Sequence, residues 1–478
     1  MIFETSMDFS VTSICDDSRD VTQGSMFFAI DGASNNGKKY IASAIDRGAK
    51  CIVSSGEQKP KWKDGVLFAY TEDPRKLLAE VAAKFYDSES LYKNSSIVAV
   101  TGTNGKSSTV DIVRQIWEHD GKRAASIGTL GAISGCCNDI GASCNLTSPG
   151  SINLHKIFKQ LHDRNIDRIA IEASSHGIHQ KRMHGIPFSV CAFTNFSQDH
   201  LDYHKTMENY WAAKEKLFSD LAGNETTFVV NLDEQYSEKI LRIAKVRGIR
   251  SLGYGFANTS DAKILNINID NNEQQIDLSF FGEKFSFLLP LFGTFQVYNS
   301  ICAALIAHAI GAKTKKIIDA MKNLKPISGR LEMISEFNGA KIYLDYAHTP
   351  DALKHAILSA RNYCRNKVIT VFGCGGGRDE EKRAEMGAIV HEYSDVAVVT
   401  DDNPRNEDPS KIRKMILQKC SDAIEIADRK LAIEAAVDML SDGDVLLLAG
   451  KGHENYQITN SGIIDFSDRD IVLQKVRK

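Results

Sequence analysis

The sequence predicts an α/β protein of three domains, and two observations carry this prediction. The chain has 478 residues, whereas a single hydrophobic core stops growing at roughly 250–300 residues. Short apolar runs rich in β-branched residues alternate with helical segments along the chain, a pattern typical of βα units. We expect a small α/β domain over residues 1–90, a central domain with a doubly wound, mostly parallel sheet of the phosphate-loop type over 91–327, and a Rossmann-like domain over 328–478.

The first predicted domain contains three apolar runs that favour strands, at 26–30, 51–53 and 66–70. Helical patterns at 40–47 and 74–86 follow them, so the segment alternates as βα units do. The polar segment that comes next, DSESLYKNSS, predicts a linker to the central domain. The N-terminal domain is therefore expected to be a separate small α/β unit.

The other two domains are predicted from short apolar strands that end in polar residues, as parallel strands of a buried sheet do. In the central domain these strands lie at 97–100, 168–172, 189–194 and 227–231, with a helix predicted at 107–117. In the last domain they lie at 341–344, 368–372, 396–400 and 445–449. Ligands of such sheets gather at the carboxyl ends of the strands.

A glycine-rich turn at 101–109 (TGTNGKSST) follows a predicted strand and precedes a predicted helix. Backbone N–H groups of such a turn and of the helix N-terminus point at an anion. The Lys106 ammonium can then reach the outer phosphates of a nucleotide, and the Ser107 hydroxyl can bind Mg²⁺. The spacing departs from the usual phosphate loop, because Ala99 stands where the first glycine is expected and Gly102 supplies the bend.

Polar side chains also follow two neighbouring strands of the central domain. Glu172 ends one strand, and Asp199 and His200 come after the next. A carboxylate and an imidazole beside a phosphate loop could ligate magnesium ions that neutralise transferring phosphates. Lys214 lies on a predicted amphipathic helix, where residue type alone predicts a solvated lysine. Further polar residues stand at element boundaries, where nucleotides are bound or helices are capped: Asn299, Arg330, Asp345 and His348.

Composition argues against several classes of protein. A net charge of −3, from 58 basic and 61 acidic side chains, gives no global electrostatic case for nucleic acid or an anionic membrane. The first twenty residues carry acids and no apolar core, and no stretch approaches the roughly 18 apolar residues of a membrane span. We expect a cytosolic protein without membrane insertion. Its ten cysteines are expected to be reduced, including the cluster Cys136, Cys137 and Cys144, which lacks a CxxC pair.

A series of motifs spans nearly the whole chain in order: DSR, TGTNGKS, LTSP, EASSHGI, TNFSQDHLDYH, YWAAK, GRLE, DYAHTPDAL, GCGGGRD, DNPR and GKGHE. On these motifs the chain resembles the Mur ligases, the ATP-dependent amide-forming enzymes that build the peptide stem of peptidoglycan. Among them it is most similar to the enzymes that add the third residue of the stem; their acceptor is UDP-N-acetylmuramoyl-L-alanyl-D-glutamate. The resemblance implies ATP, Mg²⁺ and small-molecule substrates, and a monomer.

The resemblance also implies roles for residues of this chain. Lys106, Glu172, His200 and Lys214 would be catalytic, with Ser107, Glu172, His200 and a carbamylated Lys214 at the metal. The implied ATP contacts are Gly102, Thr103, Asn104, Gly105, Lys106, Ser107, Ser108, Asn299, Arg330, Asp345 and His348. The implied contacts to the UDP-muramoyl peptide are Ser18, Arg19, Thr147, Ser148, Ser175 and Arg182. One departure is Gln296, where the family often has asparagine, and it leaves the adenine contact at that position open.

The DNPR motif resembles the signature of enzymes that take meso-diaminopimelate as the incoming amino acid. Diaminopimelate differs from lysine by a distal carboxylate, which the guanidinium fork of Arg405 can bind through two parallel charge-assisted bonds. With lysine as substrate, Arg405 would lack its anion, a fault of roughly 1–3 kcal/mol. The implied diaminopimelate contacts are Arg378, Asp402, Asn403, Arg405, Gly450 and Glu454.

The expected reaction passes the γ-phosphoryl group of ATP to the D-glutamyl carboxylate, and the amine of diaminopimelate then attacks the acyl phosphate. Phosphorylation supplies the leaving group that a carboxylate lacks, so catalysis is mostly placement and charge neutralisation. Alternatives are the same ligation with L-lysine or another amino acid, and a folylpolyglutamate synthetase-like ligase. A nucleotide-regulated binding protein without turnover and a ligase of a specialised metabolite are two further alternatives.

Overall fold

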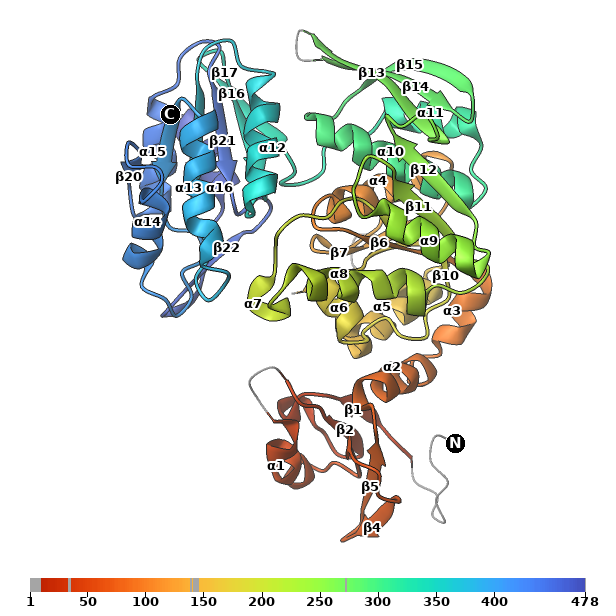
Figure 1. Ribbon diagram of the computed structural model, residues 1–478. Coiled ribbons are helices and arrows are strands. Elements are labelled where there is room, and N and C mark those ends of the chain that lie inside the picture. The colour runs from red at the N-terminus through yellow and green to blue at the C-terminus, as the bar shows by residue number, and fades with distance from the viewer. Residues whose placement is uncertain (1–9, 33–35, 138–139, 141–145, 271–272, 478) are drawn as a thin grey trace.

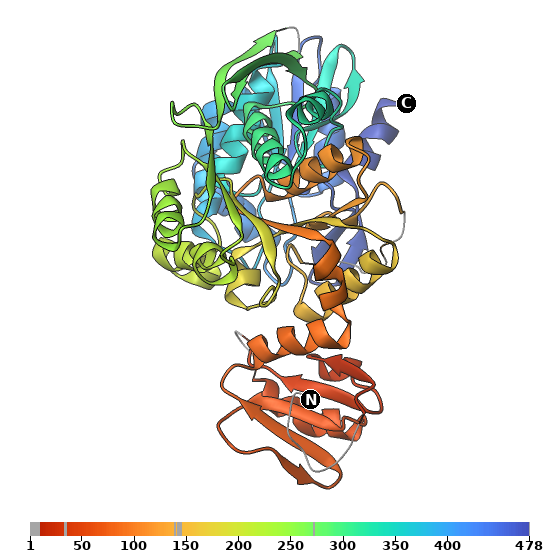
Figure 2. The same cartoon turned by 90° about the vertical axis from the view of Figure 1, so that its right-hand side faces the viewer.

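The computed structural model describes residues 10–32, 36–137, 140, 146–270 and 273–477. Three sheets divide these residues into lobes, named here by the strands they contain: an N-terminal lobe with β1–β5, a central lobe with β6–β15 and a C-terminal lobe with β16–β21. Figures 1 and 2 both show the N-terminal lobe at one end of the molecule, beneath the other two. The predicted three-part α/β architecture is confirmed, whereas the exact boundaries at residues 90 and 327 stay predictions.

The N-terminal lobe is a five-stranded sheet of order β1-β2-β3-β5-β4, parallel except for β4. Its core is made by strand residues such as Phe28 and Val53 and by Leu78 of the covering helix α2. The strands are β1 (Ser13–Cys15), β2 (Ser25–Ala29), β3 (Cys51–Ser55), β4 (Lys61–Lys63) and β5 (Val66–Thr71), and the helices are η1 (Ser18–Asp20), η2 (Gly37–Tyr40), α1 (Ile41–Asp46) and α2 (Pro74–Phe85).

The segment predicted as a polar linker is in fact the helix α3 (Ser88–Asn94). Leu91 is buried in the core of the central lobe, and Ser88 Oγ lies 2.8 Å from His155 Nδ1 in α5. Four serines and a glutamate within ten residues concealed this helix, because only Leu91 and Tyr92 mark its inner face. The connection to the N-terminal lobe is therefore packed against the central lobe.

The central lobe has ten strands in the order β15-β14-β13-β12-β11-β10-β6-β9-β7-β8. Six neighbouring strands in this order, β12, β11, β10, β6, β9 and β7, run parallel. The predicted strands that correspond to β6, β9, β10 and β11 are confirmed. Antiparallel β13–β15 extend one edge and were not predicted. The strands are β6 (Ser96–Thr101), β7 (Ala124–Gly128), β8 (Gly131–Ile133), β9 (Arg168–Glu172), β10 (Phe188–Phe193), β11 (Thr227–Asn231), β12 (Ser251–Gly255), β13 (Ala262–Asp270), β14 (Glu273–Phe280) and β15 (Glu283–Leu289).

Helices cover both faces of this sheet, as its apolar strands require. Helices α4 and α10 pack together on one face, and α5 contributes Leu154, Ile157 and Phe158 to the core on the other. The helices are α4 (Lys106–His119), α5 (Ser151–Asp163), α6 (Ser175–His179), α7 (Leu201–His204), α8 (Met207–Lys216), the π-helical turn η3 (Leu217–Leu221), α9 (Ser237–Arg247), α10 (Thr294–Ala309) and α11 (Thr314–Lys322).

The C-terminal lobe has a six-stranded sheet of order β16-β17-β21-β18-β19-β20, parallel except for β16. Its strands are β16 (Glu332–Phe337), β17 (Ala340–Asp345), β18 (Val368–Phe372), β19 (Val396–Val399), β20 (Ile424–Glu425) and β21 (Val445–Ala449), followed by the hairpin β22 (Tyr456–Thr459) and β23 (Gly462–Asp465). Its helices are α12 (Pro350–Arg361), α13 (Glu381–Tyr393), α14 (Pro409–Leu417), α15 (Arg429–Asp438) and α16 (Asp468–Val476). Within the described part of the chain, every helix is too short or too polar to cross a membrane.

Candidate active site

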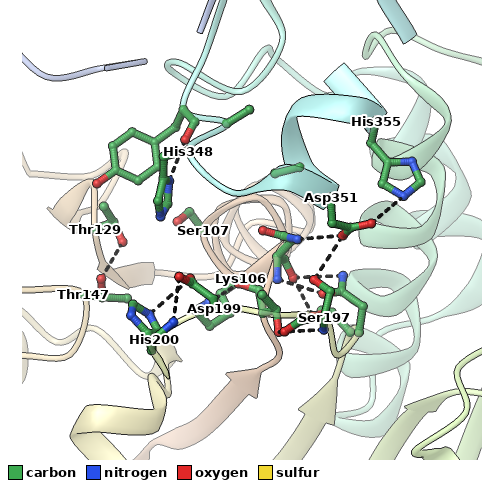
Figure 3. A pocket seen from close by; sticks show the side chains of 18 of the residues that line it. Lys106, Ser107, Thr129, Thr147, Ser197, Asp199, His200, His348, Asp351 and His355 are labelled. Atoms are coloured by element: carbon green, nitrogen blue, oxygen red, sulfur yellow. Dashed lines mark hydrogen bonds and ion pairs between the residues drawn. The ribbon is translucent and has the colours of Figure 1, made fainter. Parts of the chain in front are cut away.

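A cavity of about 600 Å³ lies between the central and C-terminal lobes. Its lining comes largely from the carboxyl ends of parallel strands in both sheets, where ligands of such sheets are bound. The residues that end or closely follow a strand and line the cavity are Thr103, Glu172, Thr194, Asn231, Asp345, Gly373 and Gly450. Figure 3 shows Lys106 and Asp199 of the central lobe facing His348 and Asp351 of the C-terminal lobe.

The predicted phosphate loop connects β6 to α4, and its bend depends on glycine. Gly102 has φ +151°, and a Cβ there would lie 1.9 Å from Thr194 Oγ1. The Lys106 ammonium donates hydrogen bonds to the carbonyls of Gly102 (2.9 Å) and Thr103 (2.7 Å). Burial lowers the pKa of Lys106, and the nearby Glu172 carboxylate opposes this shift. Of the loop residues predicted to bind ATP, Gly102 does not line the cavity. The other six do: Thr103, Asn104, Gly105, Lys106, Ser107 and Ser108.

Glu172, Asp199 and His200 also line the cavity. Glu172 is buried and accepts a hydrogen bond from the backbone N–H of Thr129 at 2.7 Å, and burial raises its pKa. Burial lowers the pKa of His200 to about 3, so its imidazole is neutral. Burial acts to raise the pKa of Asp199, but its basic neighbours, His200 first among them, hold that pKa below its ordinary value.

This donor set fits Mg²⁺, which prefers oxygen ligands and keeps several waters when one or two carboxylates and substrate phosphates hold it. A neutral imidazole, a buried carboxylate and hydroxyl groups are available on one wall. A tighter cluster of possible donors, within 4.8 Å of one another, is formed elsewhere by His391, Cys420 and Asp422. That cluster lies on α13 and the segment after α14, outside the cavity lining.

Lys214 is buried, not solvated as its residue type alone suggested. It lies on α8, one turn after Tyr210, and its ammonium sits 4.5 Å from the centre of that ring. Its Nζ donates to the Gly102 carbonyl at 2.7 Å. Burial and then the charge of Lys106 lower the pKa of Lys214 well below its ordinary value. The side chain is therefore held at the phosphate loop as a poorly solvated amine.

The C-terminal lobe brings three of the predicted ATP contacts to this cavity, and one of them, Arg330, contacts the phosphate loop. Arg330 Nη2 donates to Ser107 Oγ at 2.8 Å, and its guanidinium lies over the Tyr346 ring. Asp345 accepts two backbone N–H groups, from Leu331 and Ala347, while burial raises its pKa to about 6. The imidazole of His348 lies 2.8 Å from the Tyr346 carbonyl and also lines the cavity.

Gln296, the departure from the family pattern, supports its neighbours. Its Nε2 donates to the Arg330 carbonyl at 3.3 Å, and its Oε1 accepts from Asn299 Nδ2 at 3.0 Å. Asn299 lines the cavity, whereas Gln296 is buried behind it. The amide of Gln296 therefore acts on the site through Asn299 and Arg330.

All six residues predicted to bind the incoming amino acid line the same cavity: Arg378, Asp402, Asn403, Arg405, Gly450 and Glu454. Arg405 Nη1 donates to the carbonyls of Gly376 (2.8 Å) and Asn403 (3.4 Å). Burial and then the charge of Arg378 lower the pKa of Arg405, which stays cationic. Within the described ranges neither arginine has a carboxylate partner within 4 Å, so the two guanidinium groups favour an anion.

The predicted contacts to the UDP-muramoyl peptide are spread over a wider area. Thr147 and Ser175 line the large cavity. Arg182 lines a second hollow, of about 140 Å³, together with Asp16 of the N-terminal lobe. Ser148 is buried and donates to the Glu172 carbonyl at 2.7 Å. Ser18 and Arg19 lie on η1 and line neither cavity.

Several lining residues were absent from the sequence-based candidates. Thr129 follows β7, a strand that was not predicted, and it orients Glu172. Asp351 and His355 lie one turn apart on α12, and Asp351 contacts the phosphate loop. These two residues are four positions apart and follow a proline, a pattern that by itself predicts only the exposed surface of a helix. Of the cysteine cluster, Cys136 and Cys137 are free, and Cys144 lies outside the described residues.

Comparison with protein families divides the chain into three matched segments. Residues 10–86 match the Mur ligase family catalytic domain, 100–307 the Mur ligase middle domain and 329–452 the Mur ligase glutamate ligase domain. A UDP-N-acetylmuramoyl-L-alanyl-D-glutamate–2,6-diaminopimelate ligase of Bradyrhizobium diazoefficiens is 40% identical over 97% of this chain and 94% of its own length. The enzyme of the same name from Anaplasma marginale is also 40% identical, over 96% and 94%.

Solved structures agree with this relationship. A structure of a UDP-N-acetylmuramoyl-L-alanyl-D-glutamate–2,6-diaminopimelate ligase matches with a TM-score of 0.69 and 28% identity, covering 99% of this chain and 97% of the other. A folylpolyglutamate synthase of Mycobacterium tuberculosis shares the fold, with a TM-score of 0.66 and 16% identity, but covers only 78% of this chain and 92% of its own. The three matched segments and the near full-length relatives show that the chain belongs to the Mur ligase family.

Proposed function

We propose that this protein is an ATP-dependent ligase that joins meso-2,6-diaminopimelate to UDP-N-acetylmuramoyl-L-alanyl-D-glutamate in peptidoglycan precursor synthesis. One observation carries the proposal. A single cavity brings the phosphate loop of the central lobe together with two arginines of the C-terminal lobe that lack carboxylate partners within the described ranges. Relatives about 40% identical over nearly the full length carry this activity in their names.

The proposed chemistry begins with transfer of the γ-phosphoryl group of ATP to the D-glutamyl carboxylate. Lys106 and Arg330 both line the cavity at the phosphate loop and would neutralise the charge of the transferring group. Lys106 must exchange its two carbonyl partners for phosphate oxygens to do so. The resulting acyl phosphate has a leaving group that the carboxylate lacks.

Mg²⁺ would be held by Glu172, His200, Ser107 and a carbamate on Lys214. A bound Mg²⁺ supplies charge neutralisation for the phosphate oxygens. The chain's own contribution is a carboxylate that Thr129 holds in place and an imidazole that burial keeps neutral. Lys214, as an amine of lowered pKa, is in the form that adds to carbon dioxide, which gives a carbamate and releases one proton.

In the second step the amine of the amino acid attacks the acyl carbon, forming the amide and releasing phosphate. Arg405, Arg378 and Asn403 would hold carboxylates of diaminopimelate, and Gly450 and Glu454 would contact its distal, ammonium-bearing region. A distal carboxylate, absent from L-lysine, is the group that uncompensated guanidinium groups select. This is the feature that favours diaminopimelate over lysine.

The direct test measures phosphate release from ATP with the UDP-muramoyl dipeptide and either meso-diaminopimelate or L-lysine. Release that requires both the dipeptide and diaminopimelate is expected, and a chelator titration should abolish it until Mg²⁺ is restored. Faster turnover with L-lysine would overturn the choice of amino acid. Absence of any amine-dependent phosphate release would overturn the ligase assignment.

A further inference from the structure

Lys451 lies directly behind the amino-acid end of the cavity without lining it. It belongs to the turn that follows β21, and its side chain is 0% exposed. Its ammonium donates to Glu454 Oε2 at 3.1 Å and to Asn403 Oδ1 at 3.3 Å. Both partners line the cavity, so this buried cation contacts two residues of the site from the protein side.

The contacts of Asn403 leave its amide only one orientation. Its Oδ1 faces two groups that can only donate, the Lys451 ammonium and the backbone N–H of Ile458 at 2.9 Å. Its Nδ2 donates to Glu454 Oε2 at 2.9 Å. A rotated amide would place its NH₂ against these donors. Lys451, Asn403 and Glu454 therefore form a closed network in which each side chain holds the other two.

The buried ammonium of Lys451 is energetically unfavourable compared with an apolar side chain at the same position. Burying an ammonium carries a large desolvation penalty, which can exceed the attraction of a single carboxylate at close range. The rings of Tyr456 and Phe466, with centres 5.7 and 5.9 Å from Nζ, add a modest attraction. An apolar side chain of similar length would fill the space without this cost. An apolar side chain would not, however, hold Asn403 and Glu454 in their orientations.

We propose that Lys451 is a positioning residue for the incoming amino acid, acting through Asn403 and Glu454 without touching the substrate. The inference rests on the proposed function, because it assigns these two residues to the amino-acid subsite. It predicts that Lys451 affects the binding of diaminopimelate and leaves the binding of ATP and of the UDP-muramoyl dipeptide unchanged.

The test uses Lys451→Met, which keeps length and removes the charge, and Lys430→Met on the exposed surface of α15 as the matched control. Phosphate release gives KM for each of the three substrates. In Lys451→Met, KM for diaminopimelate should rise about 10–100-fold, the effect of losing a hydrogen bond to a charged group. KM for ATP and for the dipeptide should stay within about twofold. Lys430→Met should match the wild type.

A double-variant cycle separates positioning from a general structural role. Lys451→Met should add little to the effect of Glu454→Gln if the lysine acts through that carboxylate. Full additivity, an unchanged KM for diaminopimelate, or equal losses for all three substrates would overturn the proposal. Should Lys451→Met not fold, Lys451→Gln must show the same profile, and failure of both to fold makes the lysine purely structural, which also overturns it. A wild type without amine-dependent phosphate release would instead refute the proposed function.

Discussion

Lys106 and Lys214 donate to the same acceptor, the backbone carbonyl of Gly102, at 2.9 and 2.7 Å. They lie more than a hundred positions apart in the sequence, one on α4 and the other on α8. Two full positive charges at one carbonyl repel each other, and burial strengthens this repulsion. The structure resolves this conflict by burying Lys214 so that its pKa falls well below the ordinary value.

Replacement of Lys214 with Ala should lower kcat by about 100-fold or more, as loss of a group that places charge at the transferring phosphate does. Short carboxylates such as acetate should restore part of the activity if a carbamate is the working form. The matched control is Lys216→Ala, which removes an exposed lysine from the same helix. Full activity of Lys214→Ala would exclude the carbamate.

The Asp351 carboxylate is expected to hold the two lobes in register for ATP. Its Oδ2 accepts from Asn104 Nδ2 and from Ser197 Oγ, both at 3.1 Å, across the boundary between the lobes. Asp351→Ala loses both bonds, so kcat/KM for ATP should fall by about tenfold. Asp351→Asn keeps one acceptor oxygen and should lose less in the same steady-state assay. Equal kinetics of Asp351→Ala and wild type would mean that the contact does not aid ATP use.

The ion pair between His355 and Asp351 predicts a pH-dependent stability. The hydrogen bond to Asp351 raises the pKa of His355 above 6.5, so its contribution is complete below pH 6.5 and is lost as pH rises through the raised value. The pKa of Asp351 is lowered even though its burial acts to raise it, because bonds that include the one from His355 outweigh burial. The contribution of Asp351 is therefore present above pH 3.8 and lost as pH falls through the lowered pKa.

The melting temperature measured from pH 5 to pH 9 tests this pair. The wild type should lose stability above pH 6.5 relative to His355→Gln, whose curve should lack that component. Asp351→Asn should remove the same component, because it takes away the partner that raises the pKa of His355. Parallel curves for all three proteins would show that the pair contributes nothing.

Arg405 should determine the use of diaminopimelate far more than the binding of ATP. Its guanidinium contacts backbone carbonyls but, among the described residues, no carboxylate lies within ion-pair distance. Arg405→Ala should raise KM for diaminopimelate about 10–100-fold, the cost of losing a charge-assisted bond. Arg365→Ala, which removes an exposed arginine from the same lobe, is the control. Equal losses in KM for ATP would make Arg405 a structural residue.

Much of this fold could be predicted, because parallel strands and the phosphate loop carry local signals. The apolar run before Thr101 became β6. The turn TGTNGKS requires glycine at residue 102 because a Cβ there would collide with Thr194, a neighbour distant in the sequence. Strands β13–β15 were not predicted, although β14 alternates buried and partly exposed residues as an antiparallel strand should.

The site was harder to predict because its contacts join distant parts of the chain. The hydrogen bond between Asn104 and Asp351 joins residues 247 positions apart, and no local sequence pattern predicts it. The burial of Lys214 had a weak signal, since Tyr210 precedes it by one helical turn on the same face. Residue type pointed to solvent there, and the structure corrects it.

The ion pair of Arg429 with Asp468 is expected to be the strongest of the tested contacts for stability. Both side chains are 0% exposed and bonded at 2.8 and 2.6 Å. Asp468→Ala should therefore destabilise the C-terminal lobe by about 3–5 kcal/mol, because it leaves a buried cation without its partner. The exposed pair of Arg365 and Asp442 should contribute at most about 1 kcal/mol. Urea unfolding of Asp468→Ala and Asp442→Ala measures both.

The pair of Arg429 and Asp468 also lies next to the turn that carries part of the amino-acid subsite. Its variants can therefore be tested by KM for diaminopimelate as well as by stability. Arg429 Nη2 donates to the carbonyl of Ala449 at 3.0 Å, where β21 ends and the turn from Gly450 to Glu454 begins. The double variant Arg429→Met with Asp468→Leu removes both charges and should recover most of the stability, since buried pairs are replaced by apolar residues at little cost. It still lacks the donor to Ala449, so its KM for diaminopimelate should stay raised. Recovery of both quantities would show that the turn holds its geometry without the arginine.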